Sequence, residues 1–215
     1  MAEHVDDLEQ LLGSLSGSRA HLVGHSYGAY LALMVAIRNP ARVDRLVLAE
    51  PPVIPLFTGF PPKPQKILQL LITRPKTALP IIRFLATGLA PAASAARKFK
   101  VEEALTRIGT AILGREAFDA LPPTRLEQVR DNYIKAELLS DGFMMELDVK
   151  DVGKLRAPTL LVTGENSPVL WHRLTDRLEE LIPDARRVDI PNSSHIMHED
   201  NPTAYNQAVL SFLQA

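Results

Sequence analysis

The sequence contains no cysteine. This absence excludes disulfides, thiolate metal sites and cysteine nucleophiles, so covalent chemistry would fall to Ser, Thr, Lys, Asp, Glu or His. An excess of charge of one sign is lacking as well: 24 basic residues face 25 acidic ones, and the pI is near 6.6. With no long run of like charge, neither a nucleic acid nor a membrane surface is an expected partner.

Long apolar runs are also missing. No uninterrupted stretch reaches the roughly 18 to 20 residues of a membrane-spanning helix, and the longest candidate is the alanine-rich segment after Gly28. The amino terminus carries Glu3, Asp6, Asp7 and Glu9 where a secretory signal would be basic and then apolar. A soluble, cytoplasmic protein is therefore expected.

The 215 residues, 46% of them hydrophobic, are enough for one sizeable core. Apolar residues at spacings of three and four predict a helix over 5–15. The segments 20–23 and 43–49 predict strands, with a largely apolar helix over 29–38 between them. Leu46-Val47-Leu48 is typical of a strand that is covered on both faces, as in a parallel sheet.

The pattern changes between Pro51 and about Leu155. Prolines cluster at its start, and the later segments predict helices over 65–73, 76–89, 101–118 and 124–140. Strands over 158–164 and 186–190 follow, with a helix over 171–182 and another after Pro202. The predicted fold class is α/β: a parallel sheet of about four strands in a core of 1–52 and 155–215, with an inserted helical lid over 53–154.

Gly24-His25-Ser26-Tyr27-Gly28 has the pattern G-x-S-x-G and stands between a predicted strand and a predicted helix. In that context the pattern predicts a nucleophile elbow, a sharp turn in which side chains at the two glycine positions would collide with neighbouring backbone. Ser26 would also benefit from the dipole at the start of the helix. The alternative is an ordinary turn whose serine caps a helix.

A serine nucleophile needs a histidine base that a carboxylate orients. Of the six histidines, His195 follows the last predicted strand and so lies at the carboxyl edge of the sheet, where parallel sheets place their sites. We therefore predict His195 as the base and His198 as a neighbour in the pocket. His25, inside the elbow, is expected to point away from Ser26.

Two carboxylates are candidates for the triad acid. Glu50 ends the second predicted strand, and Glu165 follows the third. Both positions are geometrically plausible, so the spacing alone leaves the two open.

These segments together resemble the α/β-hydrolase superfamily of esterases and lipases. The resemblance rests on the elbow, on 39–43 leading into 46–48, on 158–165, and on His195 ahead of Asn201-Pro202. In most members the acid is an aspartate at the position of Ser167, and a serine cannot serve. Other members place it after the preceding strand, so the departure favours Glu50 over Glu165.

The resemblance also implies an oxyanion hole, of which the Tyr27 backbone N–H would supply one donor. The second donor would lie upstream, yet the segment before Ser26 contains no matching motif. The strands that usually precede the elbow strand are missing too, which would leave the sheet an open edge suited to oligomer formation. We therefore expect a carboxyl-terminal piece of a longer hydrolase or a gene model begun at an internal methionine.

The expected activity is hydrolysis of an ester, lactone or C–C bond in a small or medium apolar substrate, without metal or organic cofactor. A serine at position 26 argues against the aspartate-based dehalogenase and epoxide hydrolase mechanisms. The alternative is an inactive fragment or a ligand-binding protein of hydrolase shape.

Overall fold

The computed structural model describes residues 1–15, 17, 19–133 and 144–215. The chain divides into two compact units, the first formed by 1–66 and 144–215 and the second by 67–143. The second unit lies within the segment predicted as a lid, and its function as a lid stays a prediction.

The first unit is built on a parallel sheet of four strands in the order β1-β2-β3-β4. The strands are β1 (Ala20–His25), β2 (Val43–Ala49), β3 (Thr159–Gly164) and β4 (Ala185–Ile190). Their carboxyl ends meet at one edge of the sheet, because all four run in the same direction. The predicted strands and the predicted α/β class are confirmed.

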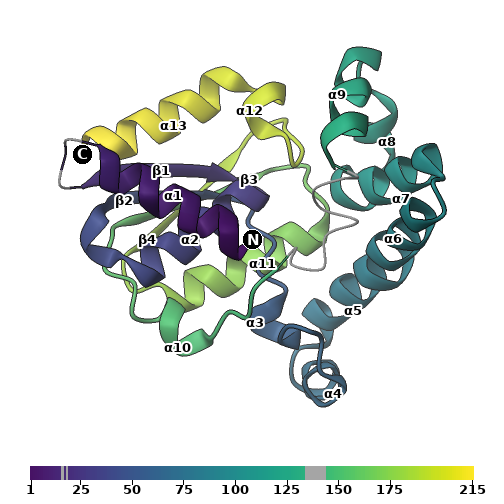
Figure 1. Ribbon diagram of the computed structural model, residues 1–215, viewed down its shortest axis with the longest axis horizontal. Helices are drawn as coiled ribbons and strands as arrows, with labels where there is room; N and C mark the ends of the chain where they lie inside the picture. The colour runs from purple at the N-terminus through teal and green to yellow at the C-terminus, as the bar shows by residue number, and fades with distance from the viewer. Residues whose placement is uncertain (16, 18, 134–143) are drawn as a thin grey trace. The chain divides into compact units, whose positions relative to one another are not determined.

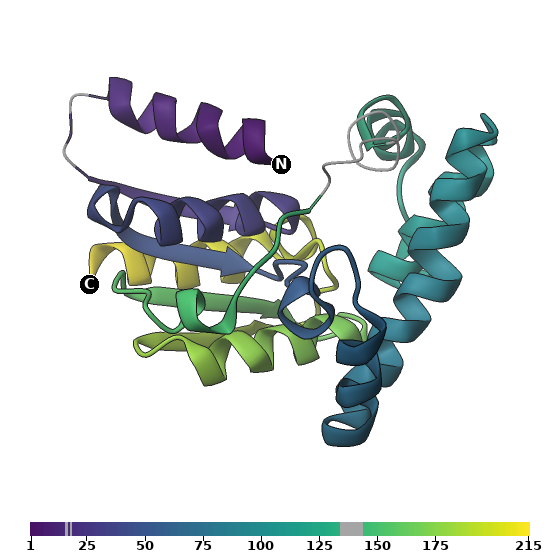
Figure 2. The same ribbon diagram turned by 60° about the horizontal axis from the view of Figure 1, so that its bottom comes forward.

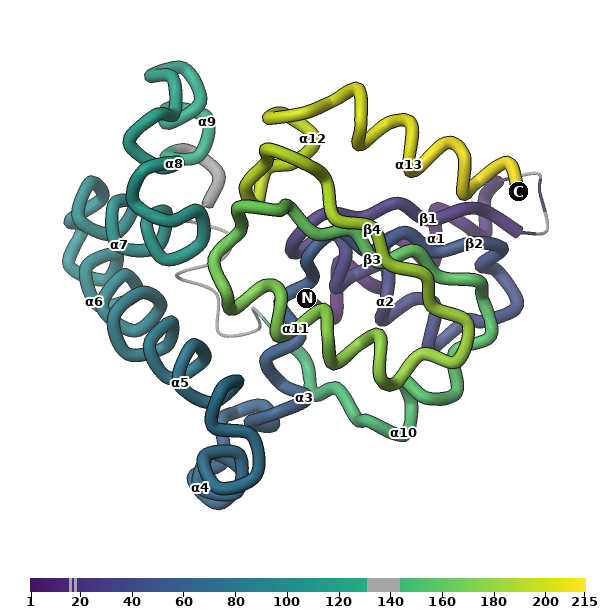
Figure 3. The backbone as a smooth tube through the Cα atoms, turned by 180° about the vertical axis from the view of Figure 1, so that it is seen from behind, coloured from purple at the N-terminus to yellow at the C-terminus, as the bar shows by residue number. Residues whose placement is uncertain are grey.

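Helices cover both faces of this sheet (Figure 1). Contacts place α2 (Tyr27–Arg38) on β1 and β2 and α11 (Val169–Leu181) on β3 and β4, while α13 (Pro202–Gln214) packs on the opposite face, as the view from behind also shows (Figure 3). Alternate residues of β2 therefore face different layers. Val47 and Ala49 join the cluster under α13, and Leu46 and Leu48 are equally buried on the other side.

The remaining helices of this unit are short or peripheral. Helix α1 (Ala2–Ser14) packs beside α2 rather than on the strands (Figure 2). It ends one residue short of the prediction. Shorter elements connect the others: η1 (Pro40–Arg42), α3 (Pro55–Thr58), α10 (Val149–Val152) and α12 (Met197–Asp200). β1 is an edge strand in the described sheet, and its Val23 is 47% exposed.

The second unit is helical throughout its described residues. Its elements are α4 (Pro64–Thr73, which begins in the first unit), α5 (Pro75–Arg83), the π-helical segment η2 (Phe84–Leu89), α6 (Ala90–Arg97), α7 (Val101–Leu113), α8 (Arg115–Asp119) and α9 (Pro123–Tyr133). Its small core joins alanines of α6 to Leu105 and Ile108 of α7. Small residues let the two helices approach closely, which explains the alanine-rich sequence.

Two predicted helices of this unit have different bounds. The helix predicted over 101–118 is broken at Gly114, whose φ of 84° is favourable for glycine, so α7 and α8 are separate. The helix predicted over 76–89 instead continues through η2 and α6 to Arg97. The predicted helix over 124–140 is α9 as far as Tyr133, and its remainder lies outside the described residues.

The continuous helix Pro75–Arg97 corrects the expectation about apolar segments. Within the described part of the chain it is the one helix that is long and apolar enough to cross a membrane. An 18-residue stretch of it has a mean hydropathy of 1.4, and 28% of that stretch is buried. The longest apolar helix is thus in the second unit and not after Gly28. Length and composition of this kind also occur in core helices of proteins that never enter a membrane.

Candidate active site

Ser26 lies in a strained turn between β1 and α2. Its φ of 51° and ψ of −120° are unfavourable for a residue with a side chain, and its backbone N–H donates to the Ala49 carbonyl at 2.8 Å. Helix α2 starts at the next residue. The turn therefore fixes Ser26 at the carboxyl edge of the sheet, between β1 and β2.

The two glycines of the motif differ in their surroundings. A Cβ at Gly24 would lie 2.5 Å from the Gly28 carbonyl oxygen and 2.6 Å from the Ala29 backbone, so only glycine fits there. A Cβ at Gly28 would meet no described atom within 4 Å outside its immediate backbone surroundings. The predicted steric need for both glycines is right for Gly24 and wrong for Gly28.

Replacing Gly24 with alanine should lower the free energy of unfolding by about 1–3 kcal/mol, because the clash involves backbone that cannot move aside alone. Gly28→Ala is the matched control and should change stability by less than about 0.5 kcal/mol. Urea denaturation followed by circular dichroism measures both. Equal losses in the two variants would show that the Gly24 contact is not what shapes the turn.

His195 and Glu50 form a buried pair at the same edge of the sheet. The Nδ1 atom of His195 lies 2.5 Å from Glu50 Oε2, and Glu50 Oε1 accepts a hydrogen bond of 2.9 Å from the Gly164 N–H. Glu50 is fully buried and His195 is 2% exposed. Glu50 directly follows β2 with a φ of 47°. The positive φ at the strand end accompanies a carboxylate that reaches β3 and the His195 loop.

Glu165 lies elsewhere. Its carboxylate is exposed and accepts a hydrogen bond of 2.8 Å from the Asn192 backbone N–H, which holds the turn after β4. Of the two predicted carboxylates, the structure thus brings Glu50, and not Glu165, into contact with His195.

Ser167, at the position where the resemblance would place an aspartate, is buried beside Glu50. The close packing at the end of β3 requires glycine at position 164. A Cβ there would come within 2.8 Å of the Ser167 hydroxyl and within 2.7 Å of the Ser193 carbonyl. The carboxylate of Glu50, which follows β2, thus contacts His195, and the small hydroxyl of Ser167 lies at the end of β3.

Burial shifts the pKa values of both partners. It raises the pKa of Glu50 to about 7, although the Ser167 hydroxyl and the Gly164 N–H oppose the rise, as do the more distant His172 and Arg187. Burial also lowers the pKa of His195 to about 3, with a smaller contribution from His198. An uncharged imidazole at neutral pH is the form that a general base requires.

The rings of Trp171 and His25 lie beside His195. The Trp171 ring stacks on it, with centroids 4.1 Å apart and planes at 23°, and the ring of His25 lies 4.7 Å away. The Nε2 atom of His25 lies 2.6 Å from the His195 carbonyl oxygen, and His198 lies 4.6 Å from His25. The sequence pattern did not identify Trp171 as a neighbour of His195. Its position one turn into the helix after β3 is the signal that could have identified it.

Tyr27 is the first residue of α2, where backbone N–H groups point out of the helix end. The helical hydrogen bonds begin with the N–H groups of Ala29 and Tyr30, both of which donate to the Ser26 carbonyl. The Tyr27 hydroxyl lies 3.0 Å from His4 Nδ1.

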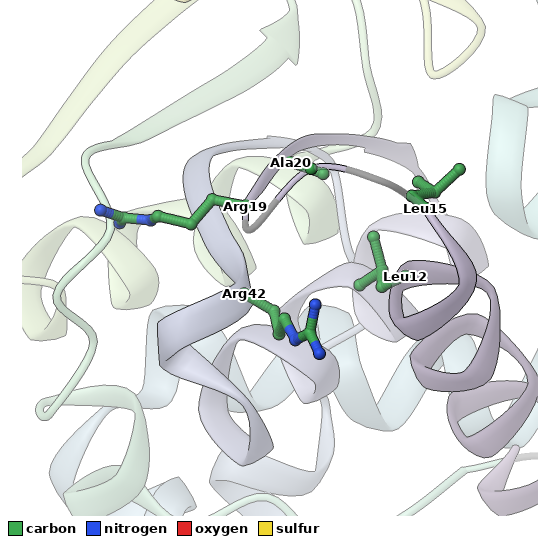
Figure 4. A pocket seen from close by; sticks show the side chains of 6 residues that line it. Leu12, Leu15, Arg19, Ala20 and Arg42 are labelled. Carbon is green, nitrogen blue, oxygen red and sulfur yellow. The ribbon is translucent and has the colours of Figure 1, made fainter.

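Two further observations concern regions other than the Glu50–His195 pair. A pocket of about 10 Å³, enough for about one water molecule, lies where β1 begins, lined by Leu12, Leu15, Gly17, Arg19, Ala20 and Arg42 (Figure 4). Among the described residues, no group of three or more histidine, aspartate or glutamate side chains is arranged to hold a metal ion.

A parallel sheet with a strained serine turn and a buried histidine–carboxylate pair at its carboxyl edge defines the hydrolase class of α/β proteins. The sequence agrees, since a model of the alpha/beta hydrolase family matches residues 1–208. The chain belongs to this family.

Curated relatives and solved structures extend the comparison. The chain is 28% identical over 219 residues to the sn-1-specific diacylglycerol lipase ABHD11 of Danio rerio, covering 97% of this chain and 61% of the relative. It is 26% identical over 209 residues to the putative carbamate hydrolase RutD of Caulobacter, covering 97% and 70%. The structure of carboxylesterase CesB (YbfK) from Bacillus subtilis matches with a TM-score of 0.61 at 22% identity, covering 99% and 66%, and shows the shared fold.

The chain thus spans about three fifths to seven tenths of the length of these relatives. The relatives are named as hydrolases and esterases, which supports an α/β-hydrolase enzyme. The activity, substrate and partners of the whole protein are matters for proposal.

Proposed function

We propose that the whole protein is a serine hydrolase in which Ser26 is the nucleophile, His195 the general base and Glu50 the acid that orients the base. The observation that carries this proposal is the buried contact of 2.5 Å between Glu50 and His195 Nδ1. A carboxylate on Nδ1 keeps the proton on that nitrogen and leaves Nε2 free to act as a base.

In the first step His195 Nε2 takes the proton of the Ser26 hydroxyl while the oxygen attacks the substrate carbonyl carbon. The carbonyl electrons move to the oxygen, and the Tyr27 N–H donates to this oxyanion. The imidazolium, stabilised by Glu50, then gives its proton to the leaving group, and an acyl-enzyme remains on Ser26.

In the second step His195 takes a proton from water, and the hydroxide attacks the acyl carbon. The tetrahedral intermediate collapses, the Ser26 oxygen recovers the proton from His195, and the carboxylic acid leaves. The chemistry needs no redox equivalent.

The substrate class proposed is a carbonyl compound of small or medium size and apolar character. It is supported by the relatives, which are named as a diacylglycerol lipase, a carboxylesterase and a putative carbamate hydrolase. Ester, carbamate and lactone carbonyls all accept a serine nucleophile and all produce an oxyanion.

Covalent labelling with a fluorophosphonate probe tests the proposal. The wild-type chain is expected to be labelled with one equivalent, since an activated serine attacks phosphorus as it attacks a carbonyl. Ser26→Ala should abolish labelling. The exposed Ser94→Ala is the matched control and should leave it unchanged.

Hydrolysis of a series of p-nitrophenyl esters with acyl chains of increasing length gives the second readout, and an optimum at short or medium length is expected. Labelling that survives Ser26→Ala would overturn the assignment of the nucleophile. A folded chain that is neither labelled nor active, but that binds the esters, would instead favour the ligand-binding alternative. Where the gene encodes residues upstream of Met1, the extended chain is labelled in parallel.

A further inference from the structure

Charge is distributed very unevenly along this nearly neutral chain. Residues 51–101 contain eight lysines and arginines and no aspartate or glutamate, whereas the remainder carries 16 basic and 25 acidic residues. The balance of the whole sequence, which predicted no membrane partner, conceals this separation. A segment of this kind produces a local positive potential whatever the net charge of the chain.

The basic side chains of the second unit in this segment are exposed. Lys76 and Arg83 lie seven residues apart on α5, so two turns of helix place them on one face, with Leu79 between them. The face continues along α6 to Arg97 and Lys98, and every charged residue on it is exposed. Figures 2 and 3 show α5 and α6 following one another as one long helix.

Large apolar side chains are also exposed in this segment of the chain. On α4, Leu68 is 61% exposed and Ile72 is 74% exposed, one helical turn apart, with Leu71 beside them at 36%. Leu79 on α5 is 63% exposed, and Phe99, just after α6, is 88% exposed. Single exposed leucines are ordinary, but a stripe of them on a short helix flanked by cations indicates an interaction surface.

The acidic residues of the second unit that the structure describes lie on α7, α8 and α9. Those on α7 and α8 pair mainly with arginines of α7, α8 and α9: Glu103 with Arg107, Asp119 with Arg115, and Glu102 with Arg130. Within the basic segment, Lys100 lies 3.5 Å from Glu103, and Lys66 on α4 lies 3.7 Å from Glu146. Lys76, Arg83, Arg97 and Lys98 are exposed to solvent.

We propose that the exposed side of α4, α5 and α6, called here the α4–α6 surface, docks on an anionic phospholipid bilayer. The surface consists of Leu68, Leu71, Ile72, Lys76, Leu79, Arg83, Arg97, Lys98 and Phe99. Leucine, isoleucine and phenylalanine side chains enter the headgroup region, while lysine and arginine meet anionic headgroups, a division of roles typical of interfacial helices. This inference does not depend on the catalytic proposal.

Vesicle flotation tests the docking with the full chain. The protein should float with vesicles in which about a third of the phosphatidylcholine is replaced by phosphatidylglycerol, and much less with phosphatidylcholine alone. About 1 M salt should release it, since the headgroup attraction is screened. Lys76→Glu with Arg83→Glu should weaken binding on the order of thirtyfold or more. Leu68→Ser with Ile72→Ser should weaken it independently.

Matched controls lie on the first unit. Lys150→Glu with Arg156→Glu makes the same change in net charge at exposed positions, and Leu11→Ser with Leu210→Ser removes leucines of similar exposure, 56% and 54%. Both controls should bind as the wild type does. Equal loss in test and control variants, equal binding to both vesicle types, or binding that salt does not reverse would each overturn the proposal. Circular dichroism checks that each variant is folded.

Discussion

Replacing Glu50 with glutamine is expected to reduce kcat by about 10⁴-fold. The glutamine amide can still accept from the Gly164 N–H, but its NH₂ group would then donate to His195 Nδ1. The imidazole would be forced to carry its proton on Nε2, where the proton of Ser26 has to be received. KM should change little, because the substitution alters a buried group behind the histidine.

Glu165→Gln is the matched control for this experiment. The two residues end neighbouring strands and the substitution is the same, but the Glu165 carboxylate is bound to the Asn192 N–H and not to His195. Its kcat should stay within about twofold of the wild type, a cost of less than 0.5 kcal/mol. A large loss in Glu165→Gln with near-normal turnover in Glu50→Gln would reverse the assignment of the acid.

The same Glu50→Gln variant is expected to be more stable than the wild type above pH 7, by up to about 3 kcal/mol. The pKa of Glu50 is raised from 4.5 to about 7 in the folded chain, chiefly by burial, and a shift of that size corresponds to about 3 kcal/mol. Glutamine keeps the hydrogen bonds and removes the buried charge. The substitution is thus expected to raise stability and to lower activity.

The raised pKa of Glu50 determines how the stability difference between Glu50→Gln and the wild type changes with pH. Below pH 4.5 the carboxyl group is protonated in both folded and unfolded chains, so Glu50 contributes no pH dependence there. Between pH 4.5 and 7 the Glu50 carboxyl group binds its proton more tightly in the folded chain, so the contribution of Glu50 to wild-type stability falls as pH rises. The gap between Glu50→Gln and wild type should therefore widen over this range and then level off.

Urea denaturation at a series of pH values measures this gap, with far-UV circular dichroism and the fluorescence of Trp171, the single tryptophan, as probes. Glu165→Gln is the matched control in this experiment as well. A gap that is constant from pH 4 to pH 8 would mean that burial does not raise the pKa of Glu50.

The α/β class and the catalytic candidates could be predicted because their signals are local. Leu46-Val47-Leu48 is a continuous apolar run that only a doubly covered strand buries fully, and the elbow motif stands between its strand and helix. Helix ends were less accurate. The break at Gly114 depends on its positive φ, and the continuation through η2 to Arg97 depends on packing of small residues against α7.

The difference between Gly24 and Gly28 could not be predicted, because it depends on how close β1 comes to the backbone of α2. The stacking of Trp171 on His195 joins two segments whose relation the sequence pattern does not encode. In both cases the sequence predicted each element correctly but did not predict how the two elements pack against each other.

By itself, the sequence determined a parallel α/β sheet and the residues at its carboxyl edge, because apolar periodicity and turn chemistry act over a few neighbouring residues. Only the tertiary structure decided which carboxylate meets His195. Glu50 and Glu165 both follow strands that end at that edge, so their spacing in the chain is equally suitable. The turn at Glu50 brings its carboxylate against Gly164 and His195, while the turn after β4 engages Glu165.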